Sequence, residues 1–342
     1  MGVNLTPIIA KHILSLEELK GKSFAVDANN YLYQFLALIR MRDGKPLVDS
    51  QGNVTSHLSG LIYRTTHLMA EYKMQLIFVF DGTPPTLKKA ELKRRHEVKE
   101  KAFKEWKEAV KVGDYQKAFS KAIVTSRLTR SMIADAKRLL KLLGVPFLQA
   151  PSEGEAQAAY LASREEVWAA SSKDYDTLLF GAPRLVRFLT LTGKKYLPSK
   201  GRFRPLKPEL IVLRELLEKH DMTRRQLVDL AILVGTDFNR GVKGVGPKTA
   251  LKLLREHGRL EDLPENIITE LNCDAQSIRR MFLEPEVEKN YKICYGELQE
   301  DETYRFLCEE RDFSRKRVHT AIERLRKFYS WRRQRDLRDW MD

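Results

Sequence analysis

The sequence has few cysteines, no long apolar run and no cluster of histidines. Its three cysteines are odd in number and widely spaced, so they indicate neither a zinc site nor a disulfide framework and fit a reducing intracellular setting. The seven histidines form no HExxH-like group, so any metal ion here is expected to be held by oxygen ligands. No apolar run approaches the roughly 20 residues of a membrane-spanning helix, and the first residues lack a signal-peptide pattern. We therefore expect a cytoplasmic protein that is neither secreted nor embedded in a membrane.

Positive charge is in clear excess. The formal net charge is +15 and the sequence pI is near 9.6. Such an excess favours a polyanionic partner, and nucleic acid is expected before any other. The 342 residues suffice for one large α/β domain or for two domains, with a sizeable core in either case.

Two pairs of carboxylates lie within residues 151–181. Glu153 and Glu155 form the first pair, and Asp174 and Asp176 form the second. The apolar run at 167–170 predicts a buried strand that ends just before the second pair, at the edge where open α/β sheets bind ligands. Four acids converging there would raise one another's pKa values unless a cation lay between them. The pattern therefore predicts a site for a hard divalent metal ion.

Helix capping is the alternative interpretation of these acids. Ser152 and Glu155 have the spacing of a capping box, and Asp176 is placed to cap a short helical turn. Capping leaves Glu153 and Asp174 unexplained, however. The alternative weakens further if more acids reach the same place.

Two more acids end predicted strands. Residues 22–28 form an apolar run that ends near Asp27, and residues 75–80 form another that is followed by Asp81. Strands that alternate with helices predict a parallel sheet wound on both faces, so all of these acids should share one edge. Other elements are expected as helices over 55–72, 126–143, 208–219 and 223–234, strands over 145–149 and 185–191, and a hairpin or mobile loop over 194–206.

Residues 86–121 are basic and poor in apolar side chains. They carry twelve Lys or Arg against six Asp or Glu, which gives a net charge of +6. One interpretation is a solvated helix laced with salt bridges. The other is a helical excursion over the sheet edge whose cations meet phosphates.

The segment 233–257 carries a second motif. Gly244, Gly246 and Lys248 fit the turn of a helix–hairpin–helix, in which glycines let the backbone approach a phosphate at a helix N-terminus. A nucleotide P-loop is excluded because Pro247 stands where that motif requires Lys. A plain glycine-rich turn between packed helices is the remaining alternative. Asp237, which precedes this turn, is a candidate seventh acid.

The chain beyond residue 311 is basic and is predicted to be helical. Leu337, Trp340 and Met341 share one apolar face at its end, with the i, i+3, i+4 spacing of a helix. Because so polar a tail has no obvious core to join, this face suggests a partner pocket.

Together, these features resemble the structure-specific 5′ nucleases of the flap endonuclease type, in their archaeal form. The resemblance covers essentially the whole chain, and its most specific strings are AVDANNYLYQFL, TSHLSGLIYRT, VFDGTPP, APSEGEAQAAYLA, SKDYDTLLFGAPRLVR and LVGTDFNRGVKGVGPKTA. It implies a PIN-like parallel-sheet core flanked by helices, in a single nuclease domain over 1–330 that acts as a monomer. It also implies a helical arch at about 83–130, a DNA-binding helix–hairpin–helix at about 223–257 and a clamp-binding tail at 331–342.

The resemblance also implies roles for individual residues. Two Mg²⁺ ions, for which Mn²⁺ substitutes, are expected among seven acids, and Lys88 and Arg95 are expected to assist catalysis from the arch. The tail is similar to the motif that binds the sliding clamp PCNA, although Met341 departs from the final aromatic. The implied metal ligands are Asp27, Asp81, Glu153, Glu155, Asp174, Asp176 and Asp237; the implied DNA contacts are Tyr33, Arg40, Arg64, Thr55, Ser56, Gly244, Gly246 and Lys248; the implied clamp contacts are Gln334, Leu337, Trp340 and Met341.

The implied activity is cleavage of DNA where a 5′ flap meets duplex, with 5′–3′ exonuclease activity, in Okazaki fragment maturation and DNA repair. Such an enzyme is expected to work at the nucleoid. Three rivals remain: a relative dominated by exonuclease or bubble cleavage, a non-catalytic junction binder tethered to the clamp, and a PIN-like ribonuclease. The intact acids argue against the binder, and the hairpin and tail argue against the ribonuclease.

Overall fold

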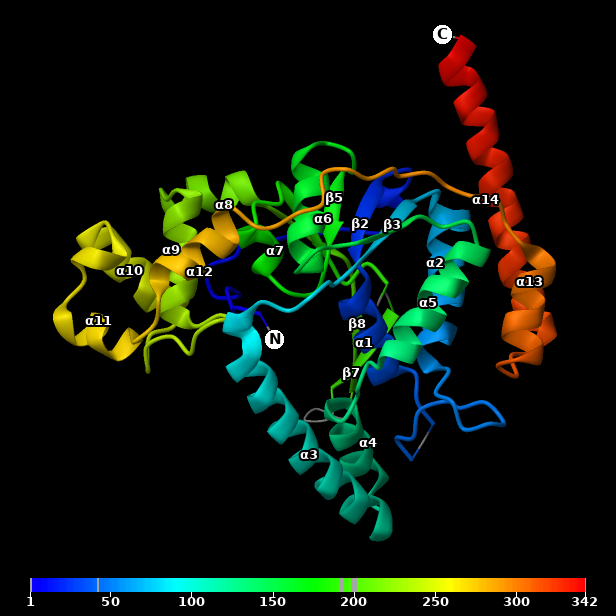
Figure 1. Ribbon diagram of the computed structural model, residues 1–342, viewed down its shortest axis with the longest axis horizontal. Coiled ribbons are helices and arrows are strands. Elements are labelled where there is room, and N and C mark those ends of the chain that lie inside the picture. The colour runs from blue at the N-terminus through cyan, green and yellow to red at the C-terminus, as the bar shows by residue number, and fades with distance from the viewer. Residues whose placement is uncertain (1, 42, 191–192, 198–201, 342) are drawn as a thin grey trace.

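A seven-stranded sheet forms the centre of the molecule. The computed structural model describes residues 2–41, 43–190, 193–197 and 202–341. In this part of the chain the strands of the central sheet lie in the order β1-β9-β6-β5-β2-β3-β4, and helices cover both faces (Figure 1). The strands are β1 (His12–Ile13), β2 (Ser23–Asp27), β3 (Gln75–Phe80), β4 (Phe147–Gln149), β5 (Ala169–Ser171), β6 (Arg184–Arg187) and β9 (Glu209–Val212), with β7 (Gly193–Leu197) and β8 (Arg202–Leu206) in a separate hairpin.

The five neighbouring strands from β6 to β4 run parallel, which confirms the expected parallel core. The other two strands are antiparallel, because β9 pairs with β6 and β1 pairs with β9. The helix expected over 208–219 is therefore wrong at its start, and α8 (Leu213–His220) begins only after β9. The short run Glu-Leu-Ile-Val is compatible with either structure, and pairing with β6 makes it a strand.

Each face of the sheet has its own apolar core. One face packs against α1 (Ala28–Leu38), α2 (Ser56–Tyr72), α5 (Arg130–Leu142) and α14 (Arg315–Met341). The other packs against α6 (Gly154–Ser163), α7 (Asp176–Leu179) and α9 (Arg224–Val234). Successive residues of β2 alternate between the two cores, as the period of a strand requires. With both faces buried, the polar side chains of the sheet gather at the strand ends.

The basic segment forms two packed helices that extend away from the sheet. After η2 (Thr86–Lys88), α3 (Lys89–Lys111) runs outward and α4 (Tyr115–Val124) returns. Gly113 lies between them with φ of +74°, a conformation that favours glycine. Figure 1 shows these two helices projecting below the body, and we call them, together with η2, the arch. The segment is therefore helical, and its own ion pairs, such as Arg94 with Glu91, fit the salt-bridged interpretation, while contact of its cations with phosphates stays a prediction.

Helices from residues 224 to 283 form a lobe at the left of Figure 1, and its apolar side chains join the core on the α9 face of the sheet. Here α9 and α10 (Pro247–His257) are joined by the glycine-rich loop 235–246. Arg279 ties the lobe together, because its guanidinium bonds both Asp229 on α9 and Glu261. No helix in the described part of the chain is long and apolar enough to cross a membrane. The remaining helices are η1 (Glu17–Leu19), η4 (Leu260–Asp262), α11 (Glu265–Leu271), α12 (Ala275–Leu283), α13 (Glu300–Tyr304) and the π-helix η5 (Arg305–Glu309).

Candidate active site

The predicted acids meet at the carboxyl edge of the parallel strands. Asp27 is the last residue of β2, Asp81 follows β3, and Asp174 comes shortly after β5. The sheet grows outward on both sides of β2, and this is the kind of position where open α/β sheets bind ligands. We call the full set the carboxylate cluster; its members are Asp27, Asp81, Glu153, Glu155, Asp174, Asp176 and Asp237.

Helix capping explains the position of one of these acids, Asp27. It does not explain the two pairs, Glu153/Glu155 and Asp174/Asp176, for which it was the alternative interpretation. Asp27 caps α1, because its Oδ1 accepts a hydrogen bond of 2.9 Å from the backbone N–H of Asn30. The capping box from Ser152 is not formed, since α6 has Glu153 at its N-cap without a capping side-chain bond. Asp176 accepts a bond of 2.8 Å from the backbone of Val3 instead of capping α7. The capping alternative is therefore wrong for Glu155 and Asp176.

Neighbouring residues fix the carboxylates in place. The backbone N–H of Gly154 donates to Asp81 at 2.8 Å, and a Cβ on Gly154 would come within 2.8 Å of that carboxylate oxygen, which explains the glycine. The side-chain amide of Asn30 donates to Asp174 at 2.9 Å. Thr177 donates to Glu155 at 2.8 Å. Asn30 and Thr177 had not been predicted, although Asn30 lies one turn after Asp27.

Burial and mutual repulsion raise the pKa of most members of the cluster. Burial is the largest cause for Asp27 and Glu155, whose pKa values lie well above the ordinary range, and nearby carboxylates add to it. Asp81 as a whole residue is exposed. The protein atoms that surround its carboxyl group nevertheless raise its pKa by shielding that group from water. The pKa of Asp176 rises to about 7 because of burial and then the charges of Asp237 and Asp174.

Two cations from the arch pair with the other side of the cluster. The ammonium of Lys88 lies 2.6 Å from Glu153 and 3.3 Å from Asp237. Arg95 also pairs with Asp237. Burial alone would raise the pKa of Asp237, but Lys88 and Arg95 outweigh it and lower that pKa. The structure thus brings both predicted arch residues to the predicted acids.

The donor set suits a hard divalent cation. All members are oxygen donors, and burial followed by neighbouring carboxylates raises the pKa values of Asp27, Glu155 and Asp176, a cost that a bound cation would offset. In this conformation no three acidic, His or Cys side chains of the described residues converge tightly enough to form a metal site. At Glu153 and Asp237, the ammonium of Lys88 contacts both carboxylates.

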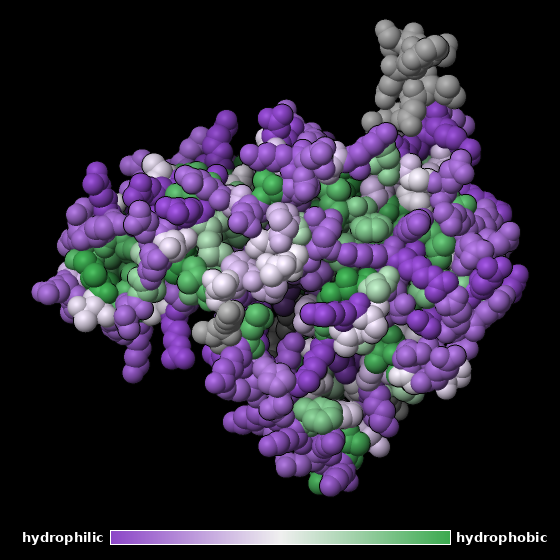
Figure 2. Space-filling model, viewed as in Figure 1, coloured by the Kyte–Doolittle hydropathy of each residue, from purple (hydrophilic) through white to green (hydrophobic). Residues whose placement is uncertain are grey.

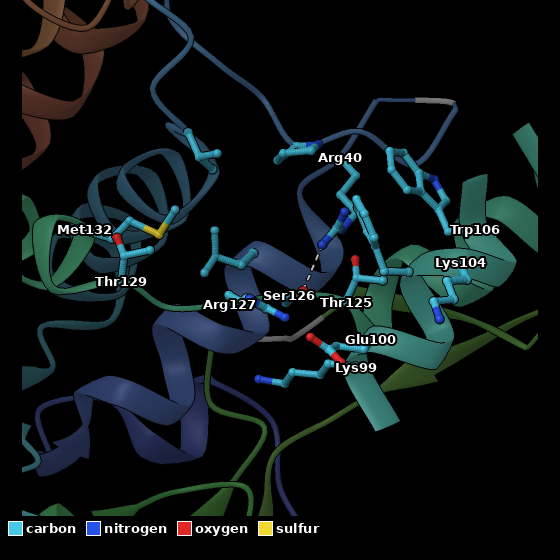
Figure 3. Close-up of a pocket in the computed structure, with 14 residues that line it drawn as sticks. Arg40, Lys99, Glu100, Lys104, Trp106, Thr125, Ser126, Arg127, Thr129 and Met132 are labelled. Carbon is cyan, nitrogen blue, oxygen red and sulfur yellow. Dashed lines mark hydrogen bonds between the residues drawn. The ribbon is translucent and has the colours of Figure 1, made fainter. Parts of the chain in front are cut away.

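A cavity of about 640 Å³ lies between the arch and the body. Figure 2 shows a hollow in this region, and Figure 3 shows side chains from α1, α3 and the start of α5 around the cavity. Arg40 donates to Gly44 at 2.6 Å and to Ser126 at 2.8 Å, and its Nε has no partner among the described residues. Lys99 and Arg127 also line the cavity, and burial followed by the charges of Arg95 and Arg127 lowers the pKa of Lys99.

The other predicted DNA contacts differ in how exposed they are. Tyr33 is 38% exposed, and the ammonium of Lys99 lies 4.8 Å from the centre of its ring. Thr55 and Ser56 are buried, and Ser56 bonds the carbonyl of Ile39 at 2.6 Å. Arg64 is exposed on α2. In the tail, Gln334 is exposed on α14, whereas the side chains of Leu337, Trp340 and Met341 lie outside the described residues.

The raised pKa of Asp176 predicts a pH-dependent stability of the metal-free protein. Between about pH 4 and pH 7 the unfolded chain loses this proton while the folded protein keeps it, so the folded state loses stability as the pH rises. Asp176→Asn removes this cost and can still accept the bond from Val3. In EDTA, the variant should therefore be more stable than the wild type at pH 8, by about 2 kcal/mol, and show little or no gain at pH 4.

Scanning calorimetry across this pH range measures the difference. Asp301→Asn, an exposed aspartate in the first turn of α13, is the matched control and should show no such trend. A stability difference for Asp176→Asn that stayed constant with pH would contradict the assigned environment.

Comparison with known proteins agrees with this geometry. Residues 1–102 match the XPG N-terminal domain, and residues 144–237 match the XPG I-region. The chain is 47% identical over 341 residues to flap endonuclease 1 of Pyrococcus furiosus, covering 99% of both chains. It is 50% identical over 337 residues to flap endonuclease 1 of Hyperthermus butylicus, covering 96% of this chain and 95% of the other.

Solved structures show the same fold. Flap endonuclease-1 from Methanococcus jannaschii superposes with a TM-score of 0.77 at 42% identity, over 97% of this chain and 100% of that one. The catalytic core of Rad2 in complex with DNA substrate matches with a TM-score of 0.68 over 94% of this chain and 97% of the other, and its 21% identity supports the fold alone. The chain therefore belongs to the flap endonuclease 1 family, and it is a nuclease that acts on DNA.

Proposed function

We propose that this protein cleaves DNA at the junction of a 5′ flap and a duplex, and that it also removes nucleotides from 5′ ends as an exonuclease. It would do so as a monomer, in Okazaki fragment maturation and DNA repair at the nucleoid. The observation that carries the proposal is the placement of seven carboxylates at one sheet edge, facing Lys88 and Arg95 from the arch. The relatives named flap endonuclease 1 support the same substrate.

The carboxylate cluster would hold two Mg²⁺ ions, and Mn²⁺ would substitute for them. Bound there, the ions would lower the pKa of a water molecule and offset the charge that develops on the attacking and leaving oxygens. Asp27, Asp81, Glu153 and Glu155 are proposed as direct ligands of the first. Asp174, Asp176 and Asp237 are proposed to hold the second, partly through water.

Lys88 and Arg95 would bind the reacting phosphate. Each already has an anionic partner, since Lys88 contacts Glu153 and Arg95 contacts Asp237. A phosphodiester is also an anion. Each of the two side chains would therefore exchange a carboxylate partner for a phosphate and still have a negatively charged partner. Donors that are already aimed at the reaction centre need little reorganisation to stabilise charge there.

The cavity beside the arch would take the unpaired strand. Arg40, Lys99 and Arg127 supply positive charge around it, and Phe103 and Trp106 supply aromatic surface. This is the combination that single-stranded nucleic acids bind, because cations follow the phosphates and rings stack on the bases. Tyr33 would stack near the cleaved nucleotide once Lys99 leaves its ring. The 3′ flap would bind near Thr55 and Ser56, and Arg64 would contact a phosphate.

The loop between α9 and α10 would bind the duplex backbone. Gly244 has a φ of +79°, which favours glycine, and the position where a Cβ of Gly246 would lie has no atom within 4 Å. Lys248 is exposed in the first turn of α10, where helix N–H groups lack intrahelical partners. Open backbone, a positive helix end and an exposed lysine together suit a phosphate.

The first prediction separates chemistry from docking. Asp174→Ala should abolish cleavage of a double-flap DNA in Mg²⁺, because a metal ligand acts on the chemical step. DNA affinity measured in Ca²⁺ should be unchanged or slightly tighter, since an anion leaves a basic cleft. Asp301→Ala is the control and should cleave normally. Wild-type cleavage by Asp174→Ala would refute the metal assignment, and a wild type without metal-dependent turnover would favour a non-catalytic junction binder.

The second prediction concerns the loop. Lys248→Ala should weaken binding to duplex-containing DNA and reduce the slope of log affinity against log salt by about one, because one phosphate contact is lost. The single-turnover rate at saturating enzyme should change little. Lys219→Ala, an exposed lysine on α8, provides the control. An unaltered salt slope would leave the loop as a plain turn.

The tail is proposed to bind a sliding clamp of the PCNA type. In Figure 1 the end of α14 projects away from the body, which leaves it accessible to a partner. Gln334, Leu337, Trp340 and Met341 have the motif spacing, and an aromatic buried at an interface centre commonly contributes about 2 kcal/mol or more. Methionine is flexible enough to replace the final aromatic with some loss of fit.

Removing residues 334–342 tests this proposal. Cleavage of free oligonucleotides should stay unchanged, while stimulation by the clamp of the same organism should disappear. Trp340→Ala in the full chain should weaken clamp binding in the same direction. Persistent clamp binding, accompanied by a loss of thermal stability and of intrinsic activity, would show instead that the tail packs on the body.

A further inference from the structure

One buried hydroxyl joins three parts of the carboxylate cluster. Ser172 follows β5 and is 1% exposed. Its Oγ lies 3.0 Å from Asp27 Oδ2 and 2.8 Å from Glu155 Oε1. The backbone N–H of Asp174 points at the same oxygen, at 3.3 Å. Residues from the end of β2, the first turn of α6 and the loop after β5 therefore meet at a single atom.

The chemistry of a hydroxyl limits what this atom can do. A serine hydroxyl has one proton to donate and two lone pairs to accept with. The N–H of Asp174 uses a lone pair, which leaves one proton for the two carboxylates. The two acids are thus held at hydrogen-bonding distance from a shared donor that can serve only one of them at a time. Their oxygens cannot be further apart than the two distances to Ser172 Oγ together.

A local role does not account for this arrangement. The bond from the Asp174 N–H alone would be an ordinary serine turn, which needs no contact to other elements. Asp27 already has a partner for Oδ1 in the N–H of Asn30, so Ser172 serves its second oxygen. Glu155 also receives a bond from Thr177, so Ser172 adds a second donor to the same oxygen.

The neighbouring serine shows the contrast. Ser171 is equally buried, but its Oγ faces the opposite side of the strand, where it donates to the carbonyl of Val186 at 2.9 Å and lies 2.5 Å from the hydroxyl of Tyr31. Ser171 contacts no member of the carboxylate cluster in these bonds. The two serines are therefore equally buried, and they differ in the hydrogen-bond partners of their hydroxyl groups.

We propose that Ser172 is a positioning residue that keeps Asp27, Glu155 and the backbone of Asp174 together, so that the cluster binds a divalent cation tightly. This inference rests on the metal-dependent hydrolysis proposed above. Groups that hydrogen-bond to metal ligands typically change metal affinity by about 10–100-fold when they are removed. Ser172 acts through its neighbours, so its loss should change metal binding more than the chemical step at saturating metal.

The test measures Mn²⁺ binding to the DNA-free full chain by electron paramagnetic resonance of the free ion. Ser172→Ala should weaken binding about tenfold. Ser172→Thr, which keeps the hydroxyl, should restore affinity to within about twofold of wild type, and Ser171→Ala should leave it unchanged. If Ser172→Ala does not fold, Ser172→Cys, which fills the site with a slightly larger side chain and a weaker donor, should show the same loss. Circular dichroism and thermal melting establish folding of each variant.

A second readout separates this proposal from the proposed function. The Mg²⁺ concentration that gives half-maximal flap cleavage should rise about tenfold in Ser172→Ala, with DNA affinity in Ca²⁺ unchanged. Wild-type Mn²⁺ affinity in a folded Ser172→Ala, or an equal loss in Ser171→Ala, would overturn the positioning role while leaving flap cleavage standing. A wild type that binds Mn²⁺ in a Ser172-dependent way but does not cleave flaps would overturn the function and support the role of Ser172.

Discussion

The burial of several carboxylates that also repel one another is the constraint on which the arrangement of this protein depends. The sheet directs acids from several strands to one edge, and burial raises the pKa of Asp27 and Glu155 well above the ordinary range. A buried charge is costly unless it is paired or hydrogen-bonded. Two kinds of compensation are visible. Hydrogen-bond donors such as Ser172 contact acids on one side of the cluster. On the other side, Lys88 and Arg95 form ion pairs with the acids.

The ion pairs also link parts of the chain that are far apart in the sequence. Lys88 lies at the base of the arch, Glu153 at the start of α6, and Asp237 in the loop after α9. The arch, the sheet edge and the lobe therefore meet at one electrostatic junction. A substrate phosphate that takes over Lys88 and Arg95 must also change what holds these three parts together. The proposed phosphate contacts of Lys88 and Arg95 would therefore couple DNA binding to the position of the arch.

The lobe that contains α9 and α10 is held together by a different kind of interaction. Arg279 is largely buried and bonds Asp229 on α9 and Glu261 in η4. Removing one partner of such a pair leaves a buried charge uncompensated, which costs stability. The loop 235–246 starts from this lobe and carries Asp237 back to the carboxylate cluster. The proposed duplex contacts of this loop would therefore be tied to the position of the cluster.

Much of the architecture follows from local sequence pattern. The runs that end at Asp27 and Asp81 are apolar and short, so they predict buried parallel strands, and the charge of residues 86–121 predicts helices outside the core. The strand β9 was missed because it has only four residues, three of them apolar, and pairing with β6 decides between strand and helix. The strand β1 has two residues and offers even less local signal.

The sequence by itself determined that many acids reach one sheet edge, because the carboxyl ends of parallel strands must coincide. It also determined that a basic helical excursion and a glycine-rich loop lie outside the core. Only the tertiary structure decided which groups touch. Ser172 serves the acids while Ser171 faces away, Lys88 lies between Glu153 and Asp237, and Lys99 covers Tyr33. These contacts join residues far apart in the chain, so they depend on how strands and helices pack and not on any local pattern.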